Sequence, residues 1–158
     1  TLLETADLIV VPGWRGLDSP VPPALCAALR KANARGCQLL SICSGVFVLA
    51  AAGLLDGRKA TTHWRYIEAL KARYPAIEVV EDVLYQDDGD ILTSAGSAAG
   101  IDLCLHVVRR DYGSRTSGTS FSRPMGIINS IPRCMIGPHA VPIVPPILFA
   151  ARTAAIPV

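Results

Sequence analysis

The last stretch of this 158-residue sequence lacks aspartate, glutamate and lysine. All 13 acidic residues lie between Glu4 and Asp111, so residues 1–113 carry a net charge of −2 (11 basic minus 13 acidic). Residues 114–158 contain four arginines and seven of the 12 prolines. Because proline interrupts helices and central strands, we expect 114–158 to be an irregular tail rather than a folded domain. The overall charge of +2 argues against a general nucleic-acid-binding surface.

The sequence also lacks paired cysteines and long apolar runs. No two of the five cysteines have Cys-x-x-Cys spacing, and no Cys/His cluster has the spacing of metal ligands, so we expect neither a metal nor a cofactor. Cys26, Cys37 and Cys104 lie in apolar periodic segments and are expected in the core. No apolar run reaches the length of a membrane span and no basic signal peptide is visible, which predicts a cytoplasmic protein without membrane contact.

What the sequence does contain is an alternation of strand and helix patterns. Continuous apolar runs predict buried parallel strands, and apolar residues at helical spacing predict the helices between them. The expected strands cover 7–12, 37–42 and 59–62, the expected helices 22–35, 44–55, 63–74 and 95–113, and the expected hairpin strands 78–86 and 90–94. This order favours an α/β fold with a mostly parallel sheet. Asp87, Asp88 and Asp90 are interpreted as a solvated hairpin turn, because no EF-hand pattern surrounds them.

A single cysteine, Cys43, stands where the strand 37–42 turns into the next helix. Ligands of open α/β sheets bind at the carboxyl ends of the strands, and Trp14 follows a second strand end. A cysteine at such an elbow lies at a helix N-terminus, which stabilises a thiolate. The backbone N–H of Ser44 and a loop N–H near Gly13 would then be placed to hold an oxyanion.

A base for Cys43 would be His63, which begins the next helix after Thr61 and Thr62. The two threonines are expected to satisfy hydrogen bonds of the strand and the helix cap. No acid in the chain clearly fits the role of orienting His63. One cysteine and one histidine without a motif also suit structural roles, so residue types and spacing leave a nucleophile, a ligand contact and a core residue open.

Three longer strings carry a family resemblance. They are LLETADLIVVPGWRG, ICSGVFVLAAAGLLDGRKATTHW and DVLYQDDGDILTSAGSAAGIDLCLHVVRRDYG. Together they resemble the PfpI-type, class-I glutamine-amidotransferase-like domain found at the N-terminus of AraC-type transcriptional regulators. The resemblance covers residues 1–113 and is specific, because long strings agree in order and spacing.

The resemblance implies a flavodoxin-like three-layer sandwich with a mostly parallel sheet, incomplete at the N-terminus. Cys43 and His63 occupy the superfamily's elbow-cysteine and histidine positions. Pro12-Gly13-Trp14 corresponds to the loop that supplies an oxyanion-hole amide in the enzymes, with Trp14 in place of a second glycine. The superfamily's conserved acid comes from an early strand that would precede Thr1, and the sheet edge left by that strand is expected to be exposed.

The resemblance further implies a ligand-sensing or dimerising module of a regulator. Cys43, His63, Gly13, Trp14 and Ser44 would line a site for an unknown small molecule. The partners implied are a second copy of the chain and DNA, the latter only through a helix-turn-helix domain absent from this chain. The alternative is a cysteine-dependent hydrolase, amidase or isocyanide hydratase, in which Cys43 attacks and His63 transfers the proton.

The resemblance stops at Gly113, which predicts a partial PfpI-type domain over 1–113 followed by the tail 114–158. The acid-free, lysine-free, proline-broken composition of the tail fits translation out of frame. Sequencing the gene beyond codon 113 tests this hypothesis. We expect a shifted frame that encodes a helix-turn-helix, and its absence would refute the frameshift.

Overall fold

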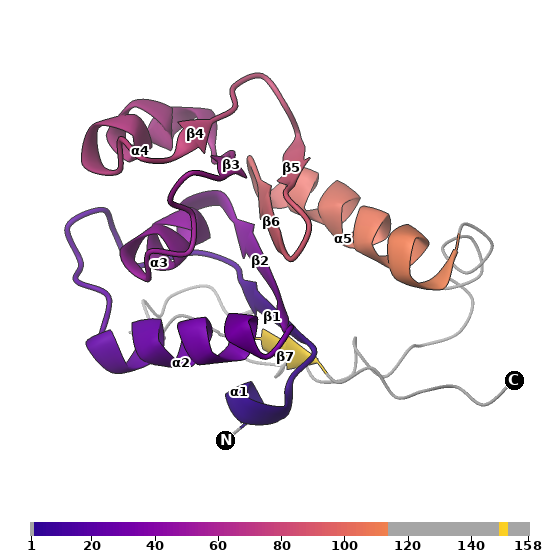
Figure 1. Ribbon diagram of the computed structural model, residues 1–158. Coiled ribbons are helices and arrows are strands. Elements are labelled where there is room, and N and C mark those ends of the chain that lie inside the picture. The colour runs from indigo at the N-terminus through magenta and orange to yellow at the C-terminus, as the bar shows by residue number, and fades with distance from the viewer. Residues whose placement is uncertain (1, 114–148, 152–158) are drawn as a thin grey trace, which may run out of the picture. The chain divides into compact units, whose positions relative to one another are not determined.

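The computed structural model describes residues 2–113 and 149–151. Its main sheet has five strands in the order β5-β6-β2-β1-β7 (Figure 1). The strands are β1 (Leu8–Val11), β2 (Gln38–Ile42), β5 (Tyr85–Asp87), β6 (Ile91–Ser94) and β7 (Phe149–Ala151). The central strands β1, β2 and β6 run parallel, while β5 and β7 pair antiparallel at the two edges. The predicted flavodoxin-like α/β fold with parallel strands at its centre is confirmed.

Helices precede, connect and follow the parallel strands. They are α1 (Leu2–Thr5), α2 (Pro23–Ala34), α3 (Val46–Ala51), α4 (Ile67–Arg73) and α5 (Ser97–Tyr112), with 3₁₀ turns η1 (Cys43–Gly45) and η2 (Trp64–Tyr66). A second small sheet pairs β3 (Lys59–Ala60) with β4 (Glu78–Val79) in parallel. Helix α2 starts where the sequence predicts, because proline is tolerated in a first helical turn, and it ends before Gly36 at φ +91°.

The core lies on the face of the sheet that α2 and α3 cover. Alternate strand residues point to opposite faces. Ile9, Leu39 and Ile91 therefore share one face, and they join Leu29 of α2 and the apolar side chains of α3 in one buried cluster. On the other face, a Cβ added at Gly100 of α5 would lie 3.0 Å from the Ile42 side chain, so the start of α5 packs directly on β2. Residues 2–103 and β7 belong to one compact unit, which contains every site described below.

Two predicted elements have different bounds. The apolar run 44–55 does not form one helix, because η1 precedes α3 and a turn follows Ala51, with Leu55 fully buried outside any helix. The predicted strand 78–86 divides into β4 and β5, which belong to different sheets. The break falls where Asp82 adopts a left-handed φ of 58°, a conformation that no extended strand contains.

Two further expectations about exposure were wrong. Cys104 is exposed on α5, whereas Cys26 and Cys37 are buried as predicted. Burial raises the pKa of the Cys37 thiol. The positive charge of Arg35 opposes this rise in pKa, and the negative charge of Asp7 adds to it. The outer edge of β1 is not open, because β7 pairs with it from Leu8 to Val10. The rest of the tail, 114–148 and 152–158, lies outside the described residues.

An ion-pair cluster ties three elements together where β6 begins. The Asp90 carboxylate accepts hydrogen bonds from Arg58 Nη1 and Asn33 Nδ2, each at 2.6 Å. Arg58 also lies 3.5 Å from the Asp88 carboxylate. Burial alone would raise the pKa of Asp90, but the hydrogen bonds from Arg58 and Asn33 outweigh it and lower this pKa below its ordinary value. The hairpin aspartates therefore anchor the turn to α2 and to residue 58.

A second constraint is the close approach of the elbow to β1. A Cβ added at Gly45 would overlap the carbonyl oxygen of Val11 and would lie 3.3 Å from the backbone nitrogen of Gly13. The φ of Gly45 is −59°, which any residue adopts. Space, and not backbone conformation, therefore requires glycine at this position.

We expect Asp90→Asn to lower the free energy of unfolding at neutral pH by about 1 kcal/mol, a modest value because the side chain is 40% exposed. Since the folded pKa of Asp90 is lowered, its stabilisation is present above the unfolded-state pKa of about 3.9 and disappears as the pH falls through the folded value. Urea unfolding from neutral to acidic pH measures both effects. The exposed Asp56→Asn is the control, and equal acid sensitivity in all three proteins would contradict the assignment.

We expect Gly45→Ala to lower the free energy of unfolding by about 3 kcal/mol or more, because the added methyl group overlaps backbone that cannot move alone. Thermal and urea unfolding measure this loss. Gly16→Ala is the matched control, because its Cβ would meet only the Ser19 hydroxyl at 3.7 Å, and it should change stability by less than about 0.5 kcal/mol. A Gly45→Ala protein as stable as the Gly16→Ala protein would refute the close contact.

Candidate functional site

The backbone at Cys43 forms the elbow that the sequence predicts. Ile42 is extended, with φ −120° and ψ 133°, and Cys43, the first residue of η1, then adopts a left-handed φ of 54°. Non-glycine residues rarely adopt this conformation. It costs about 1–3 kcal/mol of conformational free energy, which neighbouring contacts must offset. Thr62 supplies one such contact, because its hydroxyl donates a hydrogen bond of 2.8 Å to the Cys43 carbonyl. The Cys43 side chain is half-buried.

Ser44 ties the elbow to the loop that follows β1. Its Oγ accepts a hydrogen bond from the Trp14 N–H at 3.0 Å and donates one to the Trp14 carbonyl at 3.3 Å. A Cβ built at Gly13 would lie 3.6 Å from the same oxygen, so the loop passes directly over the hydroxyl. The structure thus brings Gly13, Trp14 and Ser44 together at Cys43. The Ser44 side chain, and not only its amide, does the positioning.

His63 follows Thr62 directly, so the hydrogen bond from Thr62 to Cys43 brings the histidine segment to the elbow. Its Nδ1 accepts the Arg65 backbone N–H at 3.3 Å and thereby caps η2. In the neutral ring this leaves the proton on Nε2. Within the described part of the chain, no carboxylate hydrogen-bonds to His63. The ring also lies against Gly96, where a Cβ would be 3.3 Å from Cδ2.

A buried hydroxyl group on β6 holds the segment that precedes η2. Thr93 Oγ1 on β6 accepts the Thr61 N–H at 2.8 Å, and both residues are almost fully buried. This is not the strand hydrogen bond expected of Thr61, because Thr61 lies outside β3 and the acceptor is a side chain. The expected cap is made by His63 and not by Thr62. The contact of Thr62 with Cys43 was not predicted, because nothing local in the sequence joins residues 19 positions apart.

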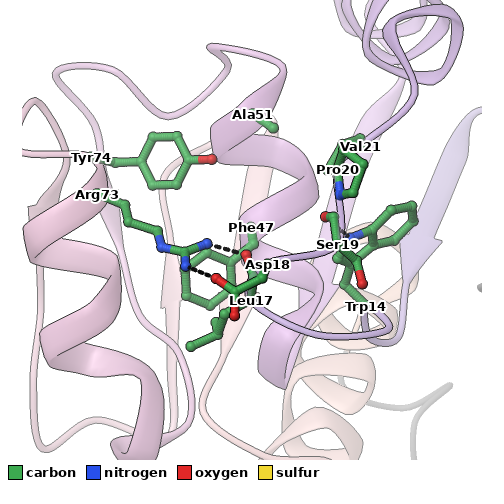
Figure 2. A pocket seen from close by; sticks show the side chains of 10 residues that line it. All are labelled: Trp14, Leu17, Asp18, Ser19, Pro20, Val21, Phe47, Ala51, Arg73 and Tyr74. Carbon is green, nitrogen blue, oxygen red and sulfur yellow. Dashed lines mark hydrogen bonds and ion pairs between the residues drawn. The ribbon is translucent and has the colours of Figure 1, made fainter.

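The ring of Trp14 and the ring of His63 line two different cavities. The His63 cavity has a volume of about 240 Å³, and Cys43 is not among its lining residues, which are Thr61, Thr62, His63, Trp64, Ile67, Glu68, Glu81, Asp82, Val83 and Ala95. The Trp14 cavity has a volume of about 300 Å³ and lies between the loop 13–21 and helices α3 and α4 (Figure 2). Sequence reasoning identified Trp14 but did not find this second cavity.

The described residues contain no cluster of three or more histidine, cysteine or carboxylate side chains that could hold a metal ion. In the same part of the chain, no helix combines the length and the apolar character needed to cross a membrane.

Comparison with known proteins relates this geometry to two kinds of relative. The HTH-type transcriptional regulator CdhR of Pseudomonas aeruginosa is 45% identical over 112 residues, which are 70% of this chain and 33% of that protein. The isonitrile hydratase of Pseudomonas putida is 37% identical over 112 residues, 70% of this chain and 48% of the enzyme. The chain spans about a third of the length of the first regulator and about half of the length of the enzyme.

Solved structures give the same picture. A crystal structure of an AraC family transcriptional regulator from Pseudomonas putida matches with a TM-score of 0.64 and 30% identity, covering 76% of this chain and 64% of that one. The sequence profile of the DJ-1/PfpI family matches residues 3–110, which include every residue of the elbow and its loop. The chain belongs to the DJ-1/PfpI family.

Proposed function

We propose that this chain is the ligand-sensing domain of an AraC-type transcriptional regulator. The support from relatives is the 45% identity with CdhR, together with the structural match to an AraC family regulator. Family membership alone does not decide between a regulator and an enzyme, because one fold hosts many functions. The decision therefore depends on the hydrogen bonds of the site itself.

One observation carries the choice of sensing over catalysis. The Trp14 N–H, which lies in the loop expected to stabilise an oxyanion, is already bound by Ser44 Oγ. An oxyanion hole requires donors that point at the reacting atom and are free to bind it. The Nδ1 of His63 is likewise held by a backbone N–H and not by an orienting carboxylate. These two hydrogen bonds favour a site that binds a small molecule without converting it.

The rest of the proposal concerns the longer protein. The chain spans about a third of the length of CdhR. We therefore assign DNA binding to parts of a longer protein that correspond to the rest of CdhR. Regulators of this kind act on DNA, so the cytoplasmic location expected from the sequence belongs to the same proposal. Self-association of the domain is also part of it, and sedimentation at several concentrations would measure the oligomeric state.

A second candidate function is that of a cysteine-dependent hydratase or hydrolase. It is favoured by the 37% identity with isonitrile hydratase and by the half-buried Cys43 at a strained elbow. In this case Cys43 Sγ would attack the substrate carbon and His63 would transfer the proton. The amides of Gly13 and Ser44 would hold the oxyanion.

The two functions predict different behaviour of Cys43→Ala. We expect a thermal-shift screen of small metabolites, which includes anions, cations and neutral compounds, to find one that stabilises the 158-residue chain. NMR spectra of this compound after incubation should show that it has not been converted. Cys43→Ala should bind it within about threefold of the original affinity, since a ligand contact of one thiol contributes little free energy. The control is Cys104→Ala, on an exposed position of α5.

The contradicting outcome uses an isocyanide as substrate. Conversion of p-nitrobenzyl isocyanide by the original chain, lost in Cys43→Ala and kept in Cys104→Ala, would replace the sensor with an enzyme. Absence of conversion in all three proteins is the result expected for a sensor.

A further inference from the structure

The cavity beside Trp14 is separate from the Cys43 elbow and has a lining of its own. Its volume of about 300 Å³ lies at the lower end of the range for small-molecule sites. The lining residues come from the loop after β1, from α3 and from the end of α4 (Figure 2); they are Trp14, Leu17, Asp18, Ser19, Pro20, Val21, Phe47, Ala51, Arg73 and Tyr74.

Three of the lining residues, Trp14, Phe47 and Tyr74, carry aromatic rings. Phe47 is buried, and its ring centroid lies 6.4 Å from that of Tyr74. The Trp14 indole N–H is satisfied by a hydrogen bond of 2.8 Å to the Ser19 carbonyl, and the half-buried ring packs in part against the core. A wall of this kind suits a flat ring, because offset and edge-to-face contacts between rings are favourable.

Two charged side chains, Arg73 and Asp18, complete the lining. Arg73 donates one hydrogen bond to the Leu17 carbonyl and one to the Asp18 carboxylate, which fastens the loop to α4 (Figure 2). The Asp18 side chain is 94% exposed, whereas that of Arg73 is 41% exposed. An ion pair with so exposed a partner contributes little, about 0–1 kcal/mol, so another carboxylate can replace Asp18 at small cost.

A guanidinium group carries five N–H donors in a planar arrangement that matches a carboxylate. Arg73 can therefore keep its bond to the Leu17 carbonyl while a second carboxylate takes the place of Asp18. Of the two charges, the guanidinium is the less exposed, so a bound anion would be better shielded from solvent here than a bound cation.

We propose that this cavity binds a small aromatic carboxylate, with Arg73 pairing the carboxylate in place of Asp18 and the ring lying against Phe47, Trp14 and Tyr74. The regulatory meaning of this site rests on the proposed sensing function. Binding would exchange the pair between Asp18 and Arg73 while the Arg73 bond to the Leu17 carbonyl stays, and the hydrogen bond between Trp14 and Ser44 connects the same loop to the Cys43 elbow. The loop is therefore the element through which occupancy reaches the elbow.

The fluorescence of Trp14 tests the proposal directly. The sequence has two tryptophans, and Trp64 is 78% exposed, so Trp64→Phe leaves Trp14 as the single reporter with little effect on packing. Phenylacetate is the probe, and phenylacetamide is its neutral counterpart. We expect a saturable change of Trp14 fluorescence with phenylacetate and binding of phenylacetamide at least about tenfold weaker.

Two charge variants in the same background give opposite expected results. Arg73→Gln should abolish the preference for the carboxylate over the amide. Asp18→Asn should bind phenylacetate about three- to tenfold more tightly, because the competing carboxylate is removed. Arg109→Gln, at an exposed position of α5, is the control and should leave both affinities unchanged.

Circular dichroism shows whether Arg73→Gln is folded. If it is not, Asp18→Asn still tests the proposal, because Asp18 lies on an exposed loop and its substitution should not affect folding. The proposal is overturned by the absence of saturation, by equal affinity for the amide, or by weaker binding in Asp18→Asn. Such a failure is distinguishable from a failure of the sensing function, because the thermal-shift screen includes compounds without a carboxylate.

Discussion

The contact between Gly45 and the Val11 carbonyl is the constraint on which the site depends. A Cβ at position 45 would overlap that oxygen, so the elbow can rest against the end of β1 only with glycine there. This placement lets Ser44 reach the backbone of Trp14 and lets Thr62 reach the Cys43 carbonyl. The left-handed Cys43 is then held from both sides, which is how a strained residue persists in a folded protein.

The strands β1 and β2, the helix α2 and the elbow could be predicted from the sequence because each is coded locally. Continuous apolar residues, a proline in the first helical turn and a glycine after the last one fix these elements. The run 44–55 was misread because Leu55 is fully buried in a turn, and burial alone does not distinguish a turn from a helix. The run 78–86 was misread because no composition signal marks the left-handed Asp82.

The candidate site was predicted less completely, because its hydrogen bonds join distant positions. The elbow pattern identified Cys43 and Ser44. Ser44 was expected to act through its backbone amide, but the structure shows that its hydroxyl binds a residue 30 positions earlier. Asp18 and Arg73 are 55 positions apart, and each alone is an ordinary surface charge. Only the fold places them side by side at one cavity. Pairings of this kind are a property of topology, which neither periodicity nor spacing encodes.

The separation of these ties also bears on how the chain is made. Ribosomes release residues 13–21 long before Ser44, and Arg73 emerges 55 residues after Asp18. The loop therefore gains its first anchor only after residue 44 has emerged and its second only after residue 73, and its apolar residues Trp14, Leu17 and Val21 pack on the core of the finished domain. In a growing chain the apolar residues of this loop consequently lack part of their cover until α4 has formed, whereas in the finished domain the loop is held at Trp14 and at Asp18.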